Sequence, residues 1–541
     1  MAGRLFTFFF ATGASFYLLV GYNRSPTWYE EGLMLYGARE ILSGGVIYED
    51  FWTLWGPGQY YFVAMMFKAL GASIMAERAA TLLTMLSLGL VIFLVAKEVM
   101  SRGPAFAATG LSIIWLGPLH VFGSPVPAAL LLALLSYLAI ARQISGKPPM
   151  WLFVAGSLAG MTALFRQDAG ILIACCEAAV IALRARFTTD TNGEDRQHKA
   201  IAPWIVPVAP YLLGVLVILV PAGVLLVSFV SLSTLADNLF LFPLKVYRSV
   251  RSVSYPSLVL PIQGLISGSL SWGSSINEFS KALLFFFPPL MIACGGLELL
   301  LLWRRGVSEL MVPAFWKLLL LLAISMALFG MAMVRSDFGH VWPAIVAGTV
   351  LLCLLGERVR ASSRLGRCFW PVALIICFVL YSRPLAGSAN LFMNCWLKPA
   401  PPVFTLDAAS GIYNKEGAPY EDAVRYVIDR VPPNEKIFVG RSPFDQADGG
   451  DMLFYFLAGR QSATKYHVMH CGLTNTAPIQ QQIVSDLDSH RVKYTVLEDS
   501  QDTGGWTCKT SKGPKILDDY IKLEFEPVKR FGRYVIWRRR G

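Results

Sequence analysis

The chain has 541 residues, of which 55% are hydrophobic and only 15% are charged, and its formal net charge is +11. Soluble domains carry about 25% charged residues, so this composition excludes an ordinary soluble protein and indicates a chain that lies mostly in lipid. The positive charge does not indicate nucleic-acid binding, because lysines and arginines gather in short segments between apolar runs, as in the cytoplasmic loops of membrane proteins.

Apolar runs along the chain predict about eleven membrane-spanning helices, since one span requires roughly 20 apolar residues. The first run follows Arg4, as the core of a secretory signal would. It is long for a signal and lacks a clear small-x-small cleavage site, so we take it as the first span. The predicted spans cover residues 5–23, 77–97, 104–122, 125–142, 150–166, 169–186, 204–230, 281–303, 314–334, 338–356 and 368–384.

The charges of the loops between the spans predict the orientation of the chain. With the N-terminus in the cytoplasm every predicted inner loop is basic, as the positive-inside rule requires. These inner loops are 97–102, 142–147, 184–199, 304–305 and 358–367. The scheme requires the helix at 57–71, within the first outer loop 24–76, to lie on the outer face without crossing. We expect an integral protein of a bacterial inner or plasma membrane.

Composition changes sharply after Pro384, where charged residues return. Residues 1–384 are thus predicted to form the membrane domain, and residues 385–541 an extracytoplasmic domain large enough for its own core. Helical and strand-like segments alternate in the second domain, which favours an α/β fold with a small mixed sheet. Helices are expected at 420–430 and 479–490, and strands at 436–439, 494–497, 523–528 and 534–537.

Three of the nine cysteines, Cys395, Cys471 and Cys508, fall in the C-terminal domain. This odd number defines no disulfide framework, although a Cys471–Cys508 bridge is one candidate. His467 and His470 precede Cys471 at spacings seen among metal ligands. No fourth ligand is identifiable, so a metal site is not expected there.

The first outer loop carries acidic residues among aromatic ones. Capping residues near its start and the Gly44-Gly45 pair predict a short helix of about 16 residues. Glu30 and Glu31 lie near the start of this helix, and Asp50 follows it. A carboxylate placed there can act as a general base toward a bound hydroxyl compound. For one of the two adjacent acids, compensation of the helix dipole is a reasonable alternative.

Charged residues also lie in three other outer segments of the predicted topology. They are Arg166-Gln167-Asp168 after the fifth span, Lys245, Arg248 and Arg251 in the outer loop 231–280, and Arg335-Ser336-Asp337-Phe338-Gly339-His340 after the ninth span. Charges at the ends of spans need a reason, and their gathering on one face indicates a shared site. The alternative is that they are ordinary interface residues that snorkel or pair locally.

The types of these side chains predict a site for a substrate that carries phosphate, because guanidinium groups match phosphate oxygens in geometry and charge. The expected phosphate ligands are Arg166, Arg248, Arg335 and His340. Asp168 and Asp337 are expected to orient the cations beside them. Salt-bridge scaffolding without a substrate is the competing explanation.

The run YEEGLMLYGAREILSGGVIYEDF, the later GPGQYY and the following ERAATLL resemble the GT-C superfamily of membrane glycosyltransferases. Within it the chain is similar to bacterial relatives of the dolichyl-phosphate-mannose–protein mannosyltransferases, glycosyltransferase family 39. Glu30-Glu31 stands where that family usually has an Asp-Glu pair. The segment from Gly44 to Asp50, the Gly56-Pro57-Gly58 turn and the two arginine motifs at 166–168 and 335–340 also match.

The resemblance implies a polyprenyl-phosphate sugar donor, an inverting transfer outside the membrane, and a first-loop acid as the base. Because Glu30 replaces the usual aspartate, the base remains to be chosen among Glu30, Glu31 and Asp50. Whether a divalent cation takes part is left open.

The predicted function is therefore transfer of a hexose or pentose to an acceptor in the cell envelope, which is a lipid, a glycan or a protein. A transporter or flippase for lipid-linked sugars is one alternative, although the two related halves with broken spans that mark many transporters are not visible. A non-catalytic envelope-assembly or receptor protein is the other alternative, and the clustered acids of the first loop weigh against it.

Overall fold

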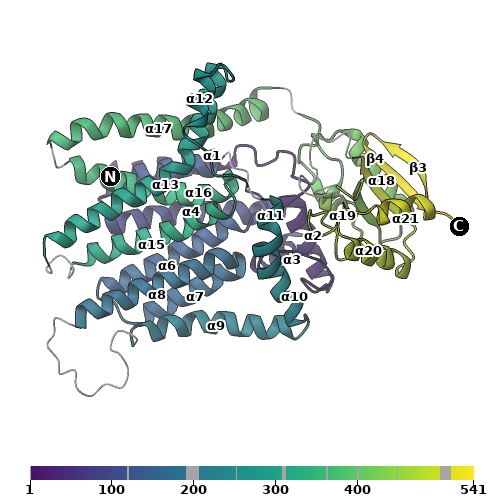
Figure 1. Ribbon diagram of the computed structural model, residues 1–541, viewed down its shortest axis with the longest axis horizontal. Helices are drawn as coiled ribbons and strands as arrows, with labels where there is room; N and C mark the ends of the chain where they lie inside the picture. The colour runs from purple at the N-terminus through teal and green to yellow at the C-terminus, as the bar shows by residue number, and fades with distance from the viewer. Residues whose placement is uncertain are drawn as a thin grey trace.

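The computed structural model describes residues 2–117, 121–189, 206–251, 253–306, 312–360, 363–398, 401–446, 449–499 and 513–541. A bundle of long helices occupies one side of the molecule and a smaller domain with a sheet occupies the other (Figure 1). Each predicted span coincides with a helix of the bundle. These helices are α1 (Ala2–Leu19), α4 (Ile74–Val99), α5 (Arg102–Leu116), α6 (Val126–Ile144), α7 (Met150–Phe165), α8 (Gln167–Thr189), α9 (Val208–Val227), α13 (Trp272–Arg304), α15 (Pro313–Val334), α16 (Phe338–Arg360) and α17 (Ser363–Phe392).

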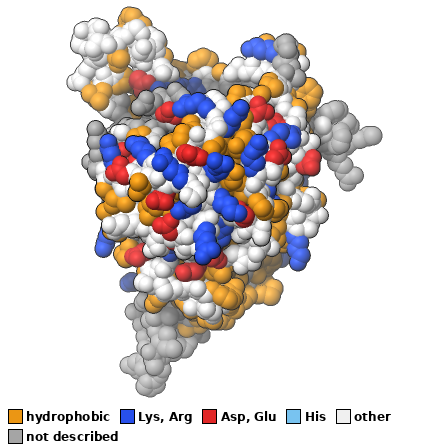
Figure 2. Space-filling model, turned by 90° about the vertical axis from the view of Figure 1, so that its right-hand side faces the viewer, with side chains coloured by type: hydrophobic (Ala, Val, Ile, Leu, Met, Phe, Trp, Pro, Cys, Tyr) orange, Lys and Arg blue, Asp and Glu red, His pale blue; other side chains and the backbone are white. Residues whose placement is uncertain are grey.

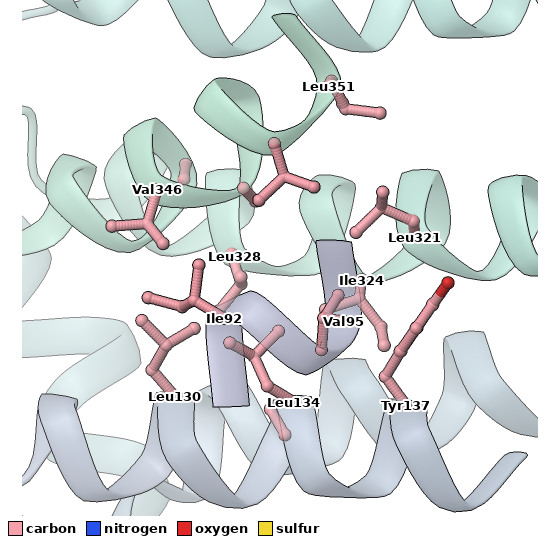
Figure 3. Close-up of a cluster of buried hydrophobic side chains, with 14 of the residues drawn as sticks. Ile92, Val95, Leu130, Leu134, Tyr137, Leu321, Ile324, Leu328, Val346 and Leu351 are labelled. Atoms are coloured by element: carbon pink, nitrogen blue, oxygen red, sulfur yellow. The ribbon is translucent and has the colours of Figure 1, made fainter. Parts of the chain in front are cut away.

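Among the described residues, seven helices are long and apolar enough to cross a membrane by length and composition alone. The buried share of each helix separates those at the centre of the bundle from those at its periphery. In α16, 72% of the most apolar 18-residue stretch is buried, whereas in α9 the share is 11%. Figure 3 shows how Ile92, Leu134, Leu328 and Val346 from four different helices meet in the centre of the bundle. Because α9 buries so little of its apolar surface against protein, that surface faces lipid. The multi-span helical fold is thus confirmed.

The two ends of the bundle differ. The N-terminus lies at the end remote from the C-terminal domain (Figure 1). Lys97, Arg305 and Arg358, from three of the predicted inner loops, line one surface recess, and the Ser101 amide donates to Glu357 at 3.1 Å. The basic loops on these helices therefore share one end, as alternating spans require.

The first outer loop forms two short helices, α2 (Glu30–Leu42) and α3 (Gly58–Leu70). Helix α2 begins at Glu30, later than the capping residues suggested, and Thr27 Oγ1 accepts a hydrogen bond from its Glu31 amide at 3.0 Å. Gly44 follows the helix with φ +89°, a conformation that favours glycine. Helix α3 has 13 residues, about 20 Å, which is too short to cross a hydrocarbon core of about 30 Å.

The predicted outer loop 231–280 is largely helical. It contains α10 (Leu232–Ala236), the π-helix η1 (Asp237–Tyr247), α11 (Arg248–Arg251) and α12 (Leu260–Ile266), and α13 begins within it. The last helix of the bundle, α17, also continues beyond the predicted span and is followed by η2 (Met393–Leu397) and η3 (Asp407–Ala409). The helices α10, η1 and α11 follow one another without a break, but the π-helical part departs from the 3.6-residue period that identifies a helix in a sequence.

The C-terminal domain has the expected α/β character. Its sheet has the strand order β1-β2-β4-β3, in which β1 and β2 are parallel and the other pairs antiparallel. The elements are α18 (Ala418–Arg430), β1 (Phe438–Ser442), α19 (Met452–Ala458), α20 (Ala477–Ser489), β2 (Tyr494–Asp499), α21 (Ile516–Glu524), β3 (Phe525–Phe531) and β4 (Tyr534–Arg539). Basic and acidic side chains are interspersed on the face of this domain turned away from the bundle, as on a surface that faces water (Figure 2).

The C-terminal domain and the first outer loop share one hydrophobic core. Helix α19 packs on α2 so closely that a Cβ atom at Gly32 would lie 2.7 Å from the Leu453 amide nitrogen. The rings of Tyr36 and Tyr455 are 5.2 Å apart, and those of Phe67 and Phe456 are 5.8 Å apart. The C-terminal domain is therefore packed against the loop that carries the acidic residues.

Candidate active site

Glu30 occupies the first turn of α2 and is solvent-exposed. Within the described part of the chain, no hydrogen bond or ion pair engages its carboxylate. Protein atoms still surround it, and this desolvation, together with the charge of Asp337, raises the pKa of Glu30 above its ordinary value of 4.5. The charges of His340, Arg335 and Arg166 act on it in the opposite direction. Glu30 is thus a free carboxylate within range of groups from two other outer segments.

Arg166 lies between α7 and α8 and is buried, and Asp168 holds it by two hydrogen bonds. The Nε atom donates to Asp168 Oδ1 at 2.9 Å and Nη2 donates to Oδ2 at 2.6 Å. Gln167, between them, donates to the Leu54 carbonyl at 2.8 Å and to the Leu239 carbonyl at 3.2 Å. The α7–α8 turn is therefore tied both to the first outer loop and to η1.

Asp337 connects the two cations of the segment between α15 and α16. It accepts a hydrogen bond from Arg335 Nε, and its other oxygen is 2.6 Å from His340 Nδ1. Burial alone would raise the pKa of Asp337, but the hydrogen bonds and charges of His340 and Arg335 hold it below its ordinary value. Arg335 Nη1 also donates to Tyr247 Oη at 3.1 Å. Asp337 therefore fixes the direction of both the Arg335 guanidinium and the His340 ring.

This arrangement leaves polar atoms available for a ligand. In the described part of the chain, Arg166 Nη1, Arg335 Nη2 and His340 Nε2 have no hydrogen-bond partner, while the other edges of these side chains are held by aspartates. A guanidinium group that is held by an aspartate but keeps one NH2 group free can donate hydrogen bonds to phosphate oxygens. The Glu30 carboxylate beside them can accept a proton.

The structure brings together the predicted residues Glu30, Arg166, Asp168, Arg335, Asp337 and His340. Sequence reasoning missed Gln167 as a connecting residue, although it lies inside the Arg-Gln-Asp motif, and Tyr247 as a partner of Arg335. No pattern marked Tyr247, because it is one aromatic residue in a segment expected to be a loop.

Glu31 lies elsewhere. It is fully buried, and both its oxygens pair with Arg78, from Nε at 2.7 Å and from Nη2 at 3.1 Å. Arg78 also donates to the Tyr22 and Arg24 carbonyls at 2.6 and 2.7 Å. This ion pair ties the start of α2 to α4 and to the end of the first span.

Asp50 lies beyond the far end of α2 from Glu30. It is exposed, accepts a hydrogen bond from the Val46 amide at 2.6 Å and lines a polar cavity of about 580 Å³ with Glu40, Glu49 and Asp486. The backbone of Arg248 begins α11, but its side chain lies outside the described part of the structure.

The described residues contain no group of three His, Cys, Asp or Glu side chains placed to hold a metal ion. At the site, Asp168 and Asp337 are already engaged by arginines, so these residues do not form a protein-only metal site. His467 is buried against Tyr36 and Phe51, and burial lowers its pKa to about 4. Cys471 is disulfide-bonded, and Cys508 lies outside the described residues.

No family model and no curated protein matches the chain. Among solved structures, the apo oligosaccharyltransferase of Archaeoglobus fulgidus is similar with a TM-score of 0.51 at 14% identity, over 90% of this chain and 69% of that one. Apo ArnT from Cupriavidus metallidurans is similar with a TM-score of 0.50 at 14% identity, over 99% of this chain and 98% of that one. At this identity the likeness concerns the fold alone, and it shows that the chain has the architecture of a multi-span membrane protein with a C-terminal domain.

Proposed function

We propose that this protein is an integral membrane glycosyltransferase that moves a sugar from a polyprenyl-phosphate donor to a cell-envelope acceptor. The observation that carries the proposal is the free carboxylate of Glu30 beside the aspartate-bound side chains of Arg166, Arg335 and His340. A base next to a phosphate-binding set is what transfer from a sugar phosphate to a hydroxyl group requires. The GT-C-like fold, shared with an oligosaccharyltransferase and with ArnT, is consistent with it.

In this reaction Arg166, Arg335 and His340 bind the phosphate of the donor through their free edges. The bond between the anomeric carbon and the phosphate oxygen breaks, and the phosphate leaves as a dianion that these cations stabilise. Asp168 and Asp337 hold the cations in place before the donor arrives, so little reorganisation is needed during the reaction.

Glu30 accepts the proton of the acceptor hydroxyl as its oxygen bonds to the anomeric carbon from the side opposite the phosphate. The sugar is transferred with inversion, and the proton ends on Glu30. A raised pKa suits this role, because a stronger base removes the proton more readily. No step is assigned to a metal ion, because the aspartates at the site are occupied by arginines.

Among the three acidic residues of the first loop, the geometry favours Glu30 as the base. Glu31 is buried and engaged in an ion pair with Arg78, so it cannot reach an acceptor hydroxyl. Asp50 lies at another cavity. The likeness to family 39 in particular, and the identities of the sugar and of the acceptor, belong to this proposal.

We further propose that the site and the C-terminal domain lie on the extracytoplasmic side of a bacterial inner membrane. The site is at the end of the bundle opposite the basic loops, as the positive-inside rule predicts for an outer site. The disulfide at Cys471 supports this side, because disulfides persist in oxidising compartments.

The test compares Glu30→Gln with Glu31→Gln in purified protein incubated with radiolabelled polyprenyl-phosphate sugars and candidate acceptors. We expect Glu30→Gln to abolish release of polyprenyl phosphate at an unchanged melting temperature. Glu31→Gln should instead lower stability by about 3–5 kcal/mol, because it leaves the Arg78 charge buried without its partner. Full activity of Glu30→Gln would exclude Glu30 as the base, and sugar-lipid movement without bond cleavage would indicate a flippase.

A further inference from the structure

The C-terminal domain reaches the candidate site through residues His470, Cys471 and Gly472, which we call the docking segment. The buried His470 ring lies 5.5 Å from the ring of Tyr247 and 5.4 Å from that of Phe242, both on η1. The same ring lies 5.8 Å from Trp52 of the first outer loop. One histidine of the distant domain is thus enclosed by two outer segments of the membrane domain.

The docking segment also packs against Val246 of η1 through Gly472. Gly472 has φ +76°, and a Cβ atom there would lie 2.5 Å from Val246 Cγ1, directly before Tyr247. The segment is fixed within its own domain, because the His470 amide donates to Thr474 Oγ1 at 2.8 Å, the Gly472 amide donates to Asn475 Oδ1 at 2.8 Å and Cys471 is disulfide-bonded. The docking segment, which is held in place by these bonds, therefore packs against Val246 and Tyr247 at the end of η1.

Tyr247, in turn, contacts the phosphate-binding set. Its hydroxyl accepts the 3.1 Å hydrogen bond from Arg335 Nη1. It leaves Arg335 Nη2 free, while Asp337 holds Arg335 Nε. The guanidinium plane is therefore fixed at two corners, one by Asp337 and one by Tyr247.

We propose that Tyr247 is a positioning residue for Arg335 and that the docking segment of the C-terminal domain holds Tyr247 in place. This inference rests on the proposed function and assigns the C-terminal domain a part in donor binding. Without the docking segment η1 has no neighbour pressing on Val246 and Tyr247 from that side, and the second fixed corner of Arg335 is lost. The free edge of Arg335 then samples several directions, and the donor phosphate binds more weakly.

The experiment measures binding of undecaprenyl phosphate to the full chain in detergent, together with KM for the donor and kcat. Tyr247→Phe keeps the ring contact with His470 but removes the hydroxyl, and we expect donor affinity to fall about tenfold, the scale of one hydrogen bond to a charged group. The value of kcat at saturating donor should change little. Tyr520→Phe is the matched control, because the Tyr520 hydroxyl also accepts a hydrogen bond from an arginine, Arg539 Nη2 at 2.8 Å, but within the C-terminal domain.

Gly472→Ala tests the docking segment itself. We expect it to weaken donor binding as Tyr247→Phe does, and the double variant to be no weaker than the single ones, because both act through the same corner of Arg335. Gly411→Ala controls for backbone strain, since Gly411 also has φ +76° but has nothing within 4 Å of a new Cβ. Undiminished donor binding by Tyr247→Phe, or additive effects in the double variant, would overturn the inference. Failure of the unmodified protein to bind undecaprenyl phosphate would instead overturn the proposed function.

Discussion

Glu30 and Glu31 are neighbours in the sequence, yet their side chains serve different parts of the molecule. Successive residues of a helix point about 100° apart, so one of two adjacent acids can face a site while the other faces the core. Glu31 turns inward to Arg78, and Glu30 turns toward the charges of Arg166, Arg335 and His340. The sequence identified the pair as the important feature, but only the packing of α2 distinguishes its members.

The surroundings of Glu30 predict the pH dependence of the reaction. A base must be ionised, so kcat/KM should rise with pH through an apparent pKa above the ordinary 4.5 of a glutamate, since desolvation by the surrounding protein atoms and the charge of Asp337 raise the pKa of Glu30. Arg335 acts in the opposite direction. Replacing it in Arg335→Gln removes a stabilising positive charge, so the acidic limb of the profile should move to higher pH.

Lys245→Gln provides the control for this profile, because Lys245 is an exposed cation on η1 that lies outside the hydrogen-bonded pairs of Arg166 and Arg335 with their aspartates. Its acidic limb should stay where it is in the unmodified protein. The profiles are measured at low donor concentration so that kcat/KM is observed. An acidic limb that Arg335→Gln leaves in place would show that a group other than Glu30 is the titrating base.

At the scale of elements, the contact between the first outer loop and the α7–α8 turn assembles the site. The Gly56-Pro57-Gly58 turn packs directly on the end of α7, where a Cβ atom at Gly56 would lie 2.2 Å from the Leu164 carbonyl oxygen. That carbonyl is two residues before Arg166. Gln167, in the α7–α8 turn, also donates a hydrogen bond to the Leu54 carbonyl of the first outer loop. Glycine is required at position 56 because two backbones meet there.

Gly56→Ala should therefore separate Glu30 from Arg166. We expect a loss of about 1–3 kcal/mol of stability, the usual cost of overpacking, together with a fall in kcat/KM larger than the loss of folded protein explains. Gly103→Ala, in α5, is the control, because a Cβ atom there meets nothing within 4 Å. Thermal melting and transfer assays on both variants decide the matter, and a fully active, equally stable Gly56→Ala would contradict the contact.

The elements also show what could be predicted from the sequence. Long apolar runs predicted the bundle helices, because a membrane span is the strongest pattern that a sequence carries. Helix α19 was missed, since all of Met452–Ala458 is buried and gives no amphipathic period. The helical nature of 232–251 was missed because η1 is a π-helix and does not follow the 3.6-residue period, and α12 has only 7 residues. Asp50 shares chemistry and loop with Glu30, but only the three-dimensional path of the loop places it at another cavity.

At the scale of the whole molecule, the C-terminal domain and the first outer loop form one packed unit. Their common core joins α2 and α3 to α18, α19 and the sheet. Residues Tyr36 and Phe67 of the loop contact rings of α19. The sequence divides near residue 384 by composition, but the hydrophobic core contains residues from both sides of this boundary. The outer domain is therefore placed to influence the site as well as to cover it.

This packing fixes the domain and the site on the same side of the membrane, so one topology experiment locates both. The N-terminus and the basic recess of Lys97, Arg305 and Arg358 lie at the opposite end. The positive-inside rule predicts that this end lies in the cytoplasm. We therefore expect alkaline phosphatase fused after Gly541 to be active in a bacterial host, and green fluorescent protein fused there to be dark.

The same reporters inserted after Gly146, in the basic loop between α6 and α7, should give the reverse pattern and serve as the control. Gly146 has φ +86° with nothing within 4 Å of its Cβ position, so an insertion disturbs no packed contact there. Phosphatase activity after Gly146 with fluorescence after Gly541 would place Glu30, Arg166 and Arg335 in the cytoplasm. Because the disulfide at Cys471 belongs to an oxidising compartment, that result would contradict both the charge pattern and the thiol chemistry of the chain.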